Sequence, residues 1–505
     1  MCLDTPGKQR AGLSPKGSSS RLGTCSDALR RHTGGHRGLP GVAPRRYGAS
    51  ETFGLVIVAG ELTSAHPKCE EASMPRALMR PLLLCLSLTI PALVLRVIEI
   101  PLPPVMDLLI FGAAIVAAAF MLAWAAEAAQ KDISGPLAIA LLALIAVLPE
   151  YAVDLYYAFA SGSNPEYAHF AAANMTGSNR LLLGFGWPLV VLIALVVSRR
   201  SATATTRSAA EPPRYLALLP QNRLDIGFLV ILGGVAFAIP LLGRIPLWFG
   251  IVLIAIFGLY LWRASQTHHD DEPEFVGSAA VIAAMPTQAR RFTVSAMFVV
   301  SGLVIVCAAE PFAEALVASG SALGMDSYFL VQWLAPLASE APEFIIAIMF
   351  AMRGMGAAAL GTLIASKVNQ WSLLVGSLPA AHWLGGGGLG LSLDGRQIEE
   401  FVLTATQTLM GVAMILALRL HRGSAITLLV LFAAQFAVTD TTARYVLSGI
   451  QAVIAIGFLI ANRGHLGATL AAPFRGRRSV PTGDAYPLAR PASAAEFPAA
   501  PADRR

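Results

Sequence analysis

The chain has 505 residues, of which 55% are hydrophobic and only 13% are charged, and its mean hydropathy is +0.62. Soluble domains carry about 25% charged residues, so this composition excludes a soluble globular protein, a chain disordered throughout and a nucleic-acid-binding protein. Much of the net charge of +6 lies in the two ends and in short loops, and the five cysteines show neither metal-binding spacing nor a disulfide framework. The composition predicts an integral membrane protein.

The two ends of the chain differ in composition from its middle. Residues 1–74 are rich in Arg, Gly, Ser and Pro, and their one apolar run, 53–60, is too short to span a membrane. We expect this extension to be disordered, or to precede a true start at Met74 or Met79. Residues 463–505 are rich in Pro, Ala and Arg, and we expect this tail to be disordered as well.

Between the ends we count twelve apolar segments of spanning length, at 81–100, 105–129, 136–160, 168–198, 223–243, 245–263, 292–318, 327–352, 357–389, 400–419, 424–440 and 445–462. They divide into a first membrane half (75–263), a short cytoplasmic linker (264–291) and a second membrane half (292–462). Twelve spans place the Arg-bearing loops 199–223 and 263–291 on the same side as both termini. By the positive-inside rule, this predicts that both termini are cytoplasmic. The sequence predicts an all-α polytopic protein, and its high Ala, Arg and Gly content favours the cytoplasmic membrane of a bacterium.

Polar residues inside the apolar spans indicate where function lies. The third span contains Pro149-Glu150, with Asp154 one turn further on, and the eighth contains Ser-Glu-Ala-Pro-Glu at 339–343. A carboxylate is costly in the bilayer centre, and a proline frees a backbone carbonyl that can become a ligand. Two Pro-Glu pairs at corresponding positions therefore predict a shared cation site.

The helix after each Pro-Glu pair carries polar residues too. Residues 173–184 and 365–376 align without a gap, sharing an Ala, a small-polar group and Leu-Leu-x-Gly, and Ala-Glu at 126–127 matches Ala-Glu at 309–310. The matching spans are five apart, an odd number, so the second copy enters the membrane in the opposite direction. The pattern predicts two inverted-topology five-helix repeats, with the ion site near the membrane midplane where they meet.

These motifs resemble those of the sodium/calcium exchanger superfamily of cation/calcium antiporters, over roughly residues 105–440. The resemblance implies that Glu150 and Glu343 are the two essential glutamates and bind the metal directly. In the first repeat two registers remain open, one selecting Asn174 and Ser178 and the other Ser178 and Asn179. The full set of implied cation-binding residues is Glu150, Glu343, Asn174, Ser178, Asn179, Ser339, Glu340, Ser366 and Gln370, with Asp154, Arg180 and Lys367 expected to tune the site.

The sequence departs from the family pattern in ways that bear on the transported ion. Ala146 and Val147 stand where the family has Thr and Ser, Glu340 stands where Ser belongs, and Lys367 takes an Asn position. Calcium prefers about six to eight oxygen ligands, and these changes remove neutral oxygens. We expect a secondary active antiporter that exchanges Na+ or Ca2+ against H+ or Na+ by alternating access, with proton coupling to a monovalent ion favoured. Small cations and the lipid bilayer are the expected partners, and no cofactor is expected.

Other interpretations of the same residues remain open. The glutamates could be structural partners of Arg180 or Lys367, and the Asn and Ser residues could be interhelical hydrogen-bonding groups. His-His-Asp-Asp-Glu-Pro-Glu at 268–274 could bind a regulatory metal, although such runs are more often solvated loops. The alternative function is a non-transporting sensor or a channel on the same fold. An intramembrane enzyme is disfavoured because no HExxH, GxSxG or Walker motif is present.

Overall fold

The computed structural model describes residues 76–132, 148–205, 214–266, 275, 277–438 and 440–475. The extension before residue 75, the predicted acidic loop at 268–274 and the tail beyond residue 475 lie outside the described residues.

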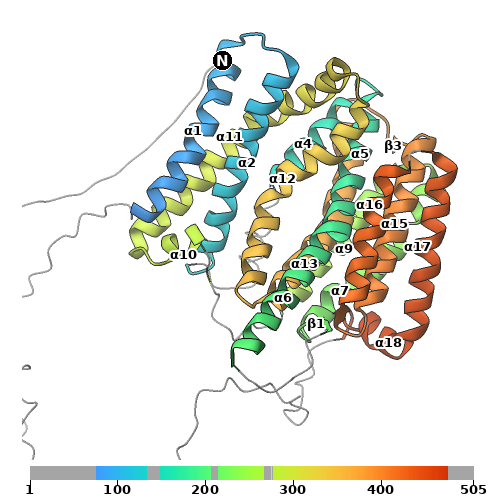
Figure 1. Ribbon diagram of the computed structural model, residues 1–505. Helices are drawn as coiled ribbons and strands as arrows, with labels where there is room; N and C mark the ends of the chain where they lie inside the picture. The colour runs from blue at the N-terminus through green and yellow to red at the C-terminus, as the bar shows by residue number, and fades with distance from the viewer. Residues whose placement is uncertain are drawn as a thin grey trace, which may run out of the picture. The chain divides into compact units, whose positions relative to one another are not determined.

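The first membrane half is almost wholly helical (Figure 1). Its elements are α1 (Arg76–Ile98), α2 (Pro104–Ala129), α4 (Leu148–Ala160), α5 (Tyr167–Leu181), the π-helical turn η1 (Leu182–Gly186), α6 (Trp187–Thr205), α7 (Asn222–Val235), α8 (Ala238–Leu242) and α9 (Leu247–Ala264). The second half follows the same plan, with α10 (Gly277–Ala283), α11 (Thr287–Leu323), α12 (Ser327–Met352), α13 (Gly356–Asn369), the π-helical turn η2 (Gln370–Leu374), α14 (Val375–Leu384), α15 (Gly395–Ile415), α16 (Arg422–Ala437), α17 (Thr441–Ala461) and α18 (Arg463–Ala471).

The predicted all-α membrane fold is confirmed. Within the described residues, nine helical segments are long and apolar enough to cross a membrane, and α5, η1 and α6 form one of them. Helices also occupy the other three predicted spans. These are α4, whose predicted span begins outside the described residues, the α13–α14 segment, and the shorter helix α16. The number twelve and the inverted repeat remain predictions.

The C-terminal boundary differs from the prediction, because the described chain continues in an ordered form to residue 475. Helix α18 (Arg463–Ala471) packs against α7, where Arg223 donates to the Thr469 hydroxyl over 3.2 Å. Gly227 makes this approach possible, since a Cβ there would lie 2.5 Å from the Thr469 carbonyl oxygen. Composition predicted disorder here because it carries no information about this tertiary contact.

Two short antiparallel strand pairs join the loops of the two halves. Strand β1 (Tyr215–Ala217) pairs with β4 (Arg419–His421), and β2 (Arg244–Pro246) pairs with β3 (Gly390–Ser392). Three-residue strands leave no alternating hydrophobic pattern, so the sequence did not reveal them. Each pair holds a loop of the first half against a loop of the second.

Helices from both halves also pack directly against each other. Helix α2 packs along α11 and α1, while α15 packs along α17, and Figure 1 shows these two groups on opposite sides of α4, α5 and α12.

In the turn after α2, Asp132 accepts two hydrogen bonds from Arg290 of α11, at 2.6 and 2.8 Å. This hydrogen bonding is the main cause that lowers the pKa of Asp132 to about 2. The ion pair fastens the end of α2 to the start of α11.

Candidate cation site

The candidate site forms where α5 of the first half meets α12 of the second. Gly177 lets the two helices approach closely, because a Cβ at this position would lie only 1.7 Å from the Gln332 carbonyl oxygen of α12. The next residue, Ser178, is thereby brought against Glu340 of α12. Any larger residue at position 177 would push the helices apart and separate these two side chains.

Four buried side chains meet at a single point, and we call Glu150, Ser178, Glu340 and Gln370 the acidic cluster. The Ser178 hydroxyl lies 2.5 Å from Glu150 Oε1 and also hydrogen-bonds Glu340 Oε1. The Gln370 amide nitrogen, from η2, lies 2.8 Å from the Ser178 hydroxyl, 3.1 Å from Glu150 Oε1 and 2.7 Å from Glu340 Oε1. None of the four side chains belongs to a residue more than 4% exposed. Two carboxyl groups therefore share the same donors out of contact with bulk water.

The second predicted glutamate lies beside this cluster. Glu343 follows Glu340 on α12, is half-buried and accepts a 3.0 Å hydrogen bond from the Ser366 hydroxyl of α13. Ser178 and Ser366 each hydrogen-bond the glutamate of a Pro-Glu pair, and each lies four residues before a π-helical turn. This geometry favours the register of the first repeat that selects Ser178 and Asn179, because in it Ser178 corresponds to Ser366.

Two oxygen atoms of the acidic cluster have no hydrogen-bond partner in the described part of the chain. These are Glu340 Oε2 and Gln370 Oε1, both buried. A buried polar atom left without a partner requires an explanation, such as a water or an ion. Among the described residues no group of three or more His, Cys, Asp or Glu side chains is gathered tightly enough to hold a metal. Any cation here would need the neutral oxygens of Ser178 and Gln370 in addition to carboxylates.

Lys367 and Asn179 form a contact that borders the cluster. The fully buried Lys367 ammonium donates to the Asn179 backbone oxygen at 2.5 Å and to its side-chain oxygen at 2.8 Å. It also interacts electrostatically with Glu340 and Glu150, without a direct ion pair to either in the described structure. Lys367 thus lies near Glu150 and Glu340, and Asn179 is occupied in accepting its hydrogen bonds.

Asp154, one turn after Glu150 on α4, and Asn174, one turn before Ser178 on α5, lie together. Asp154 is fully buried, interacts electrostatically with Glu150, and has the Asn174 side chain beside it. The two residues border the acidic cluster without hydrogen-bonding to its members.

The structure does not bring every candidate to the cluster. The Ser339 hydroxyl bonds back to the carbonyl oxygens of Ala335 and Pro336 on its own helix, at 3.2 and 3.4 Å. Glu310 pairs with Arg96 at 2.5 Å, with both side chains partly exposed. Glu127 lies in α2 and is only partly buried. Neither Ser339 nor Glu310 hydrogen-bonds a member of the acidic cluster in the described structure.

Arg180 belongs to a second group of buried charges, which we call the arginine cluster and which consists of Arg180, Glu399, Glu400 and Arg444. Arg180 pairs with Glu400 of α15 at 2.5 Å, and both side chains are at most 1% exposed. Arg444 of α17 hydrogen-bonds Glu400 and lies 3.4 Å from Glu399. The described structure thus places the ion pair of Arg180 with Glu400 and not with the Pro-Glu glutamates.

Neutral amides complete the arginine cluster. Gln435 accepts from Arg180 at 3.0 Å and donates to Gln407 at 3.0 Å, and Gln407 donates to the Arg180 backbone oxygen at 3.2 Å. Glu399, Glu400 and Arg444 could not be recognised from the sequence, because they stand at the ends of apolar spans, where charges normally face water. The one available signal is that Glu400 and Arg444, which are opposite in charge, stand at the starts of the predicted spans 400–419 and 445–462.

Comparison with known proteins shows which family this chain belongs to. The sodium/calcium exchanger protein family matches residues 105–266 and 293–439. The crystal structure of an H+/Ca2+ exchanger, CAX, is 36% identical with a TM-score of 0.72, over 79% of this chain and 98% of that chain. The structure of YfkE shares the fold at 14% identity and a TM-score of 0.50, over 75% of this chain and 99% of that one. No curated protein sequence matches the chain significantly. The chain belongs to the sodium/calcium exchanger protein family, whose members are multi-pass membrane antiporters of small cations.

Proposed function

We propose that this protein is a secondary active antiporter that exchanges Ca2+ for protons at the acidic cluster. The related structure at 36% identity is that of an H+/Ca2+ exchanger, which favours Ca2+ over the monovalent ion that the sequence departures suggested. Ion exchange is the expected activity, and no bond-making chemistry is assigned to the cluster. We place the protein in the cytoplasmic membrane of a bacterium, with the arginine-rich loops inside.

The hydrogen-bond pattern around Ser178 carries the proposal. A hydroxyl group has one hydrogen to donate. The Ser178 oxygen already accepts from the Gln370 amide, and it contacts a carboxyl oxygen on each of Glu150 and Glu340. It can donate to only one of them, so the other contact is satisfied when that carboxyl group carries a proton and donates to Ser178. The arrangement therefore suits a cluster that holds at least one proton between its two carboxyl groups.

The same atoms suit a cation once that proton has left. Calcium binds hard oxygen ligands, and the cluster offers carboxylate, hydroxyl and amide oxygens. Glu340 Oε2 and Gln370 Oε1 have no hydrogen bond to give up, so they are free to turn to a cation. Glu150, Glu340 and the neighbouring Glu343 supply three carboxyl groups, and the two in the cluster carry enough charge, once deprotonated, to neutralise a divalent ion. Proton and cation would thus compete for the same oxygens.

Alternating access follows from where the ligands are anchored. Glu150 and Ser178 come from α4 and α5 of the first half, and Glu340 and Gln370 from α12 and η2 of the second. A relative movement of the two halves would open the cluster to one side of the membrane at a time. The close contact at Gly177 lies on this boundary.

The test is a flux assay in proteoliposomes that contain a trapped pH dye. A pulse of external Ca2+ should raise the lumenal pH, and Na+ or K+ pulses should not. Glu150→Gln and Glu340→Gln should abolish the response, while Glu310→Gln, an acid-to-amide change outside the cluster, should preserve it. Lumenal pH that does not respond to Ca2+, or that responds equally in Glu150→Gln, would refute the proposal. Ca2+ entry without proton counterflow would indicate a channel.

A further inference from the structure

Asp154 of α4 and Asn174 of α5 form a buried polar pair beside the acidic cluster. Asp154 is 0% exposed and Asn174 is 1% exposed. They meet because Asp154 is one turn after Glu150 and Asn174 is one turn before Ser178, on two helices that pack against each other. The pair therefore repeats, one turn further along, what the first half contributes to the acidic cluster, which is a carboxyl group on α4 and a neutral polar side chain on α5.

The oxygen atoms of this pair have few partners within the described residues. The Asn174 side chain lies close enough to interact with the Asp154 carboxyl group, yet neither oxygen of Asp154 accepts a hydrogen bond of normal geometry. Asn174 Oδ1 has no hydrogen-bond partner either. Buried polar atoms are rarely left in this state, and a water or an ion is the usual explanation.

No basic side chain compensates the Asp154 carboxylate in the described part of the chain. The titratable groups that interact with it are Glu150, Tyr151 and Tyr157, and none of these carries a positive charge. The buried ammonium of Lys367 interacts with glutamates of the acidic cluster instead. A carboxylate buried among membrane helices without an opposite charge is costly, and such residues usually border an ion pathway.

Beyond Asp154, polar groups continue toward the end of α4. Tyr157 is fully buried on the same face of α4 as Glu150 and Asp154, and it interacts electrostatically with both Asp154 and the exposed Glu314 of α11. The neighbouring Tyr156 donates to Glu314 Oε1 at 2.8 Å. Glu150, Asp154 and Glu314 thus form a series of acidic groups from the buried cluster to the protein surface.

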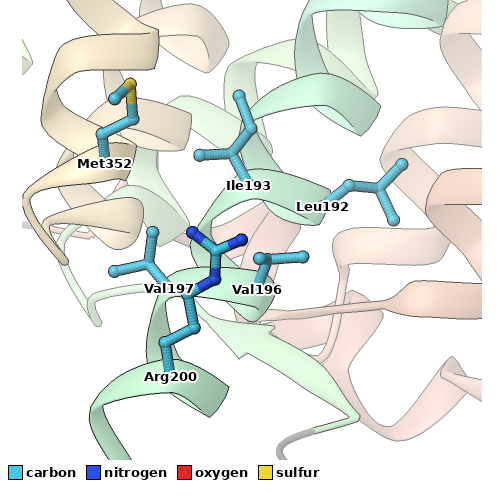
Figure 2. A pocket seen from close by; sticks show the side chains of 6 residues that line it. All are labelled: Leu192, Ile193, Val196, Val197, Arg200 and Met352. Carbon is cyan, nitrogen blue, oxygen red and sulfur yellow. The ribbon is translucent and has the colours of Figure 1, made fainter.

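Other parts of the described structure do not offer this combination. At the matching positions of the second half, Ala347 lies four residues after Glu343, and the exposed Thr362 lies four residues before Ser366. The groove between α6 and α12, shown in Figure 2, has no carboxyl or amide side chain to bind a cation, because it is lined by Leu192, Ile193, Val196, Val197, Arg200 and Met352. The pair of Asp154 and Asn174 is therefore specific to the first half.

We propose that Asp154 and Asn174 form a second cation-binding position, which Ca2+ occupies on its way between the acidic cluster and the surface near Glu314. Asp154 supplies its two carboxylate oxygens and Asn174 its amide oxygen, which are hard ligands of the kind that Ca2+ prefers, and water completes the coordination. This inference rests on the proposed function, because the occupant is the exchanged cation. The second position lets the cation leave the acidic cluster in two short steps, each of which ends at a carboxylate.

The test uses Tb3+, a luminescent probe of Ca2+ sites that is excited through nearby tyrosines, with the full-length protein in detergent. The background variant is Glu150→Gln with Glu340→Gln, which removes both carboxylates of the acidic cluster. It should still bind Tb3+, and Ca2+ should compete. Adding Asp154→Asn should weaken this binding at least about tenfold, since even groups that only orient a metal ligand are worth about 10- to 100-fold. Adding Glu310→Gln instead should leave it unchanged, because Glu310 pairs with Arg96 outside the cluster.

Asn174→Ala, which keeps every remaining carboxylate, should weaken Tb3+ binding in the same background by a smaller factor. Thermal unfolding shows whether each variant is folded. With Ca2+ binding intact in the wild-type protein, the inference is overturned by a background variant that binds no Tb3+, or by equal affinity with and without Asp154→Asn. If Asp154→Asn does not fold, unchanged affinity in Asn174→Ala overturns it. Wild-type protein that binds neither Tb3+ nor Ca2+ would contradict the proposed function itself, and this inference with it.

Discussion

The acidic cluster and the arginine cluster are both buried within the helices, yet their charges are arranged differently. In the arginine cluster, Arg180 and Arg444 face Glu399 and Glu400, so two positive and two negative groups are paired directly. In the acidic cluster, Glu150 and Glu340 share donors from Ser178 and Gln370, and the neighbouring Glu343 accepts from Ser366. The nearby Lys367 donates its hydrogen bonds to Asn179.

We propose that this difference separates structural from transport roles. In the arginine cluster each buried charge lies against a charge of opposite sign, and these ion pairs fasten α5 to α15 and α17. An unbalanced set with oxygens left over is satisfied only when a proton or a cation is added. Charge inside the membrane is therefore not by itself a sign of ion binding, whereas an excess of charge with free ligand atoms is.

The largest expected effect is in the acidic cluster. Glu150→Gln and Glu340→Gln should each abolish Ca2+-driven proton flux, because a neutral amide can neither release a proton nor supply the carboxylate charge. The fold should persist, since the amide resembles the protonated carboxyl group in shape. Flux in proteoliposomes and thermal unfolding in detergent measure the two properties. A variant that transports normally would show that its carboxylate is dispensable.

The arginine cluster should respond in the opposite way. Glu400→Gln should lower the free energy of unfolding by about 3–5 kcal/mol, because it leaves the buried Arg180 without its carboxylate partner. Arg180→Gln should cost less, because Arg444 still pairs with Glu400. The exchange rate per folded molecule should change little. Denaturation of the purified variants, together with flux normalised to folded protein, tests this. Loss of exchange in a variant of wild-type stability would place the arginine cluster in the transport path.

Ser178→Ala tests the shared hydroxyl. Removing it should weaken Ca2+ binding about 10- to 100-fold, as losses of groups that orient metal ligands do. Ser366→Ala should have a smaller effect, because Ser366 bonds only the half-buried Glu343. Calcium titrations of the two variants give the comparison. Equal effects would mean that Glu343 is as central as the acidic cluster.

The smallest expected effect lies outside both clusters, at Asp132. Asp132→Asn should lower stability by about 1–2 kcal/mol through loss of its charged hydrogen bonds to Arg290. The pKa of Asp132 is lowered to about 2 in the folded protein, against about 3.9 in an unfolded chain. The stabilisation is thus complete above about pH 4 and is lost as the pH falls toward 2.

Thermal unfolding between pH 2 and 7 measures the effect of Asp132, and the difference between wild type and Asp132→Asn should shrink on acidification. Arg291→Gln is the control. Its side chain is 65% exposed and contacts Asp132 at 3.2 Å, so its loss should matter much less. A difference that stays constant down to pH 2 would contradict the assigned ion pair.

Much of the acidic cluster could be predicted from the sequence, because carboxylates and amides inside apolar spans stand out by type alone. Glu150, Ser178, Glu340 and Gln370 were all among the candidates. The sequence could not tell whether Glu340 or Glu343 contacts Ser178. The two glutamates are close together on α12, and only the packing of the helices distinguishes them. That packing depends on the close contact at Gly177, which has no linear signature.

The arginine cluster shows what the sequence hides. Hydropathy locates a span but does not show whether a charged side chain at its end is buried or faces water. From the sequence, Glu400 and Arg444 are therefore expected to face water. Their burial results from the packing of α17 along α15, a tertiary contact. The same limit explains α18, whose order comes from its contact with α7 and not from its composition.

The most direct test of the account is to count the protons released when Ca2+ binds. Calorimetric titrations of the detergent-solubilised protein with Ca2+, at one pH in buffers of different ionisation enthalpy, give that number. We expect release of at least about one proton per Ca2+ in the wild-type protein, because the metal ligands must lose protons to bind, and a smaller release in Glu340→Gln. Calcium binding with the same heat in every buffer would mean that no proton leaves, and would contradict competition between proton and cation at Glu150 and Glu340.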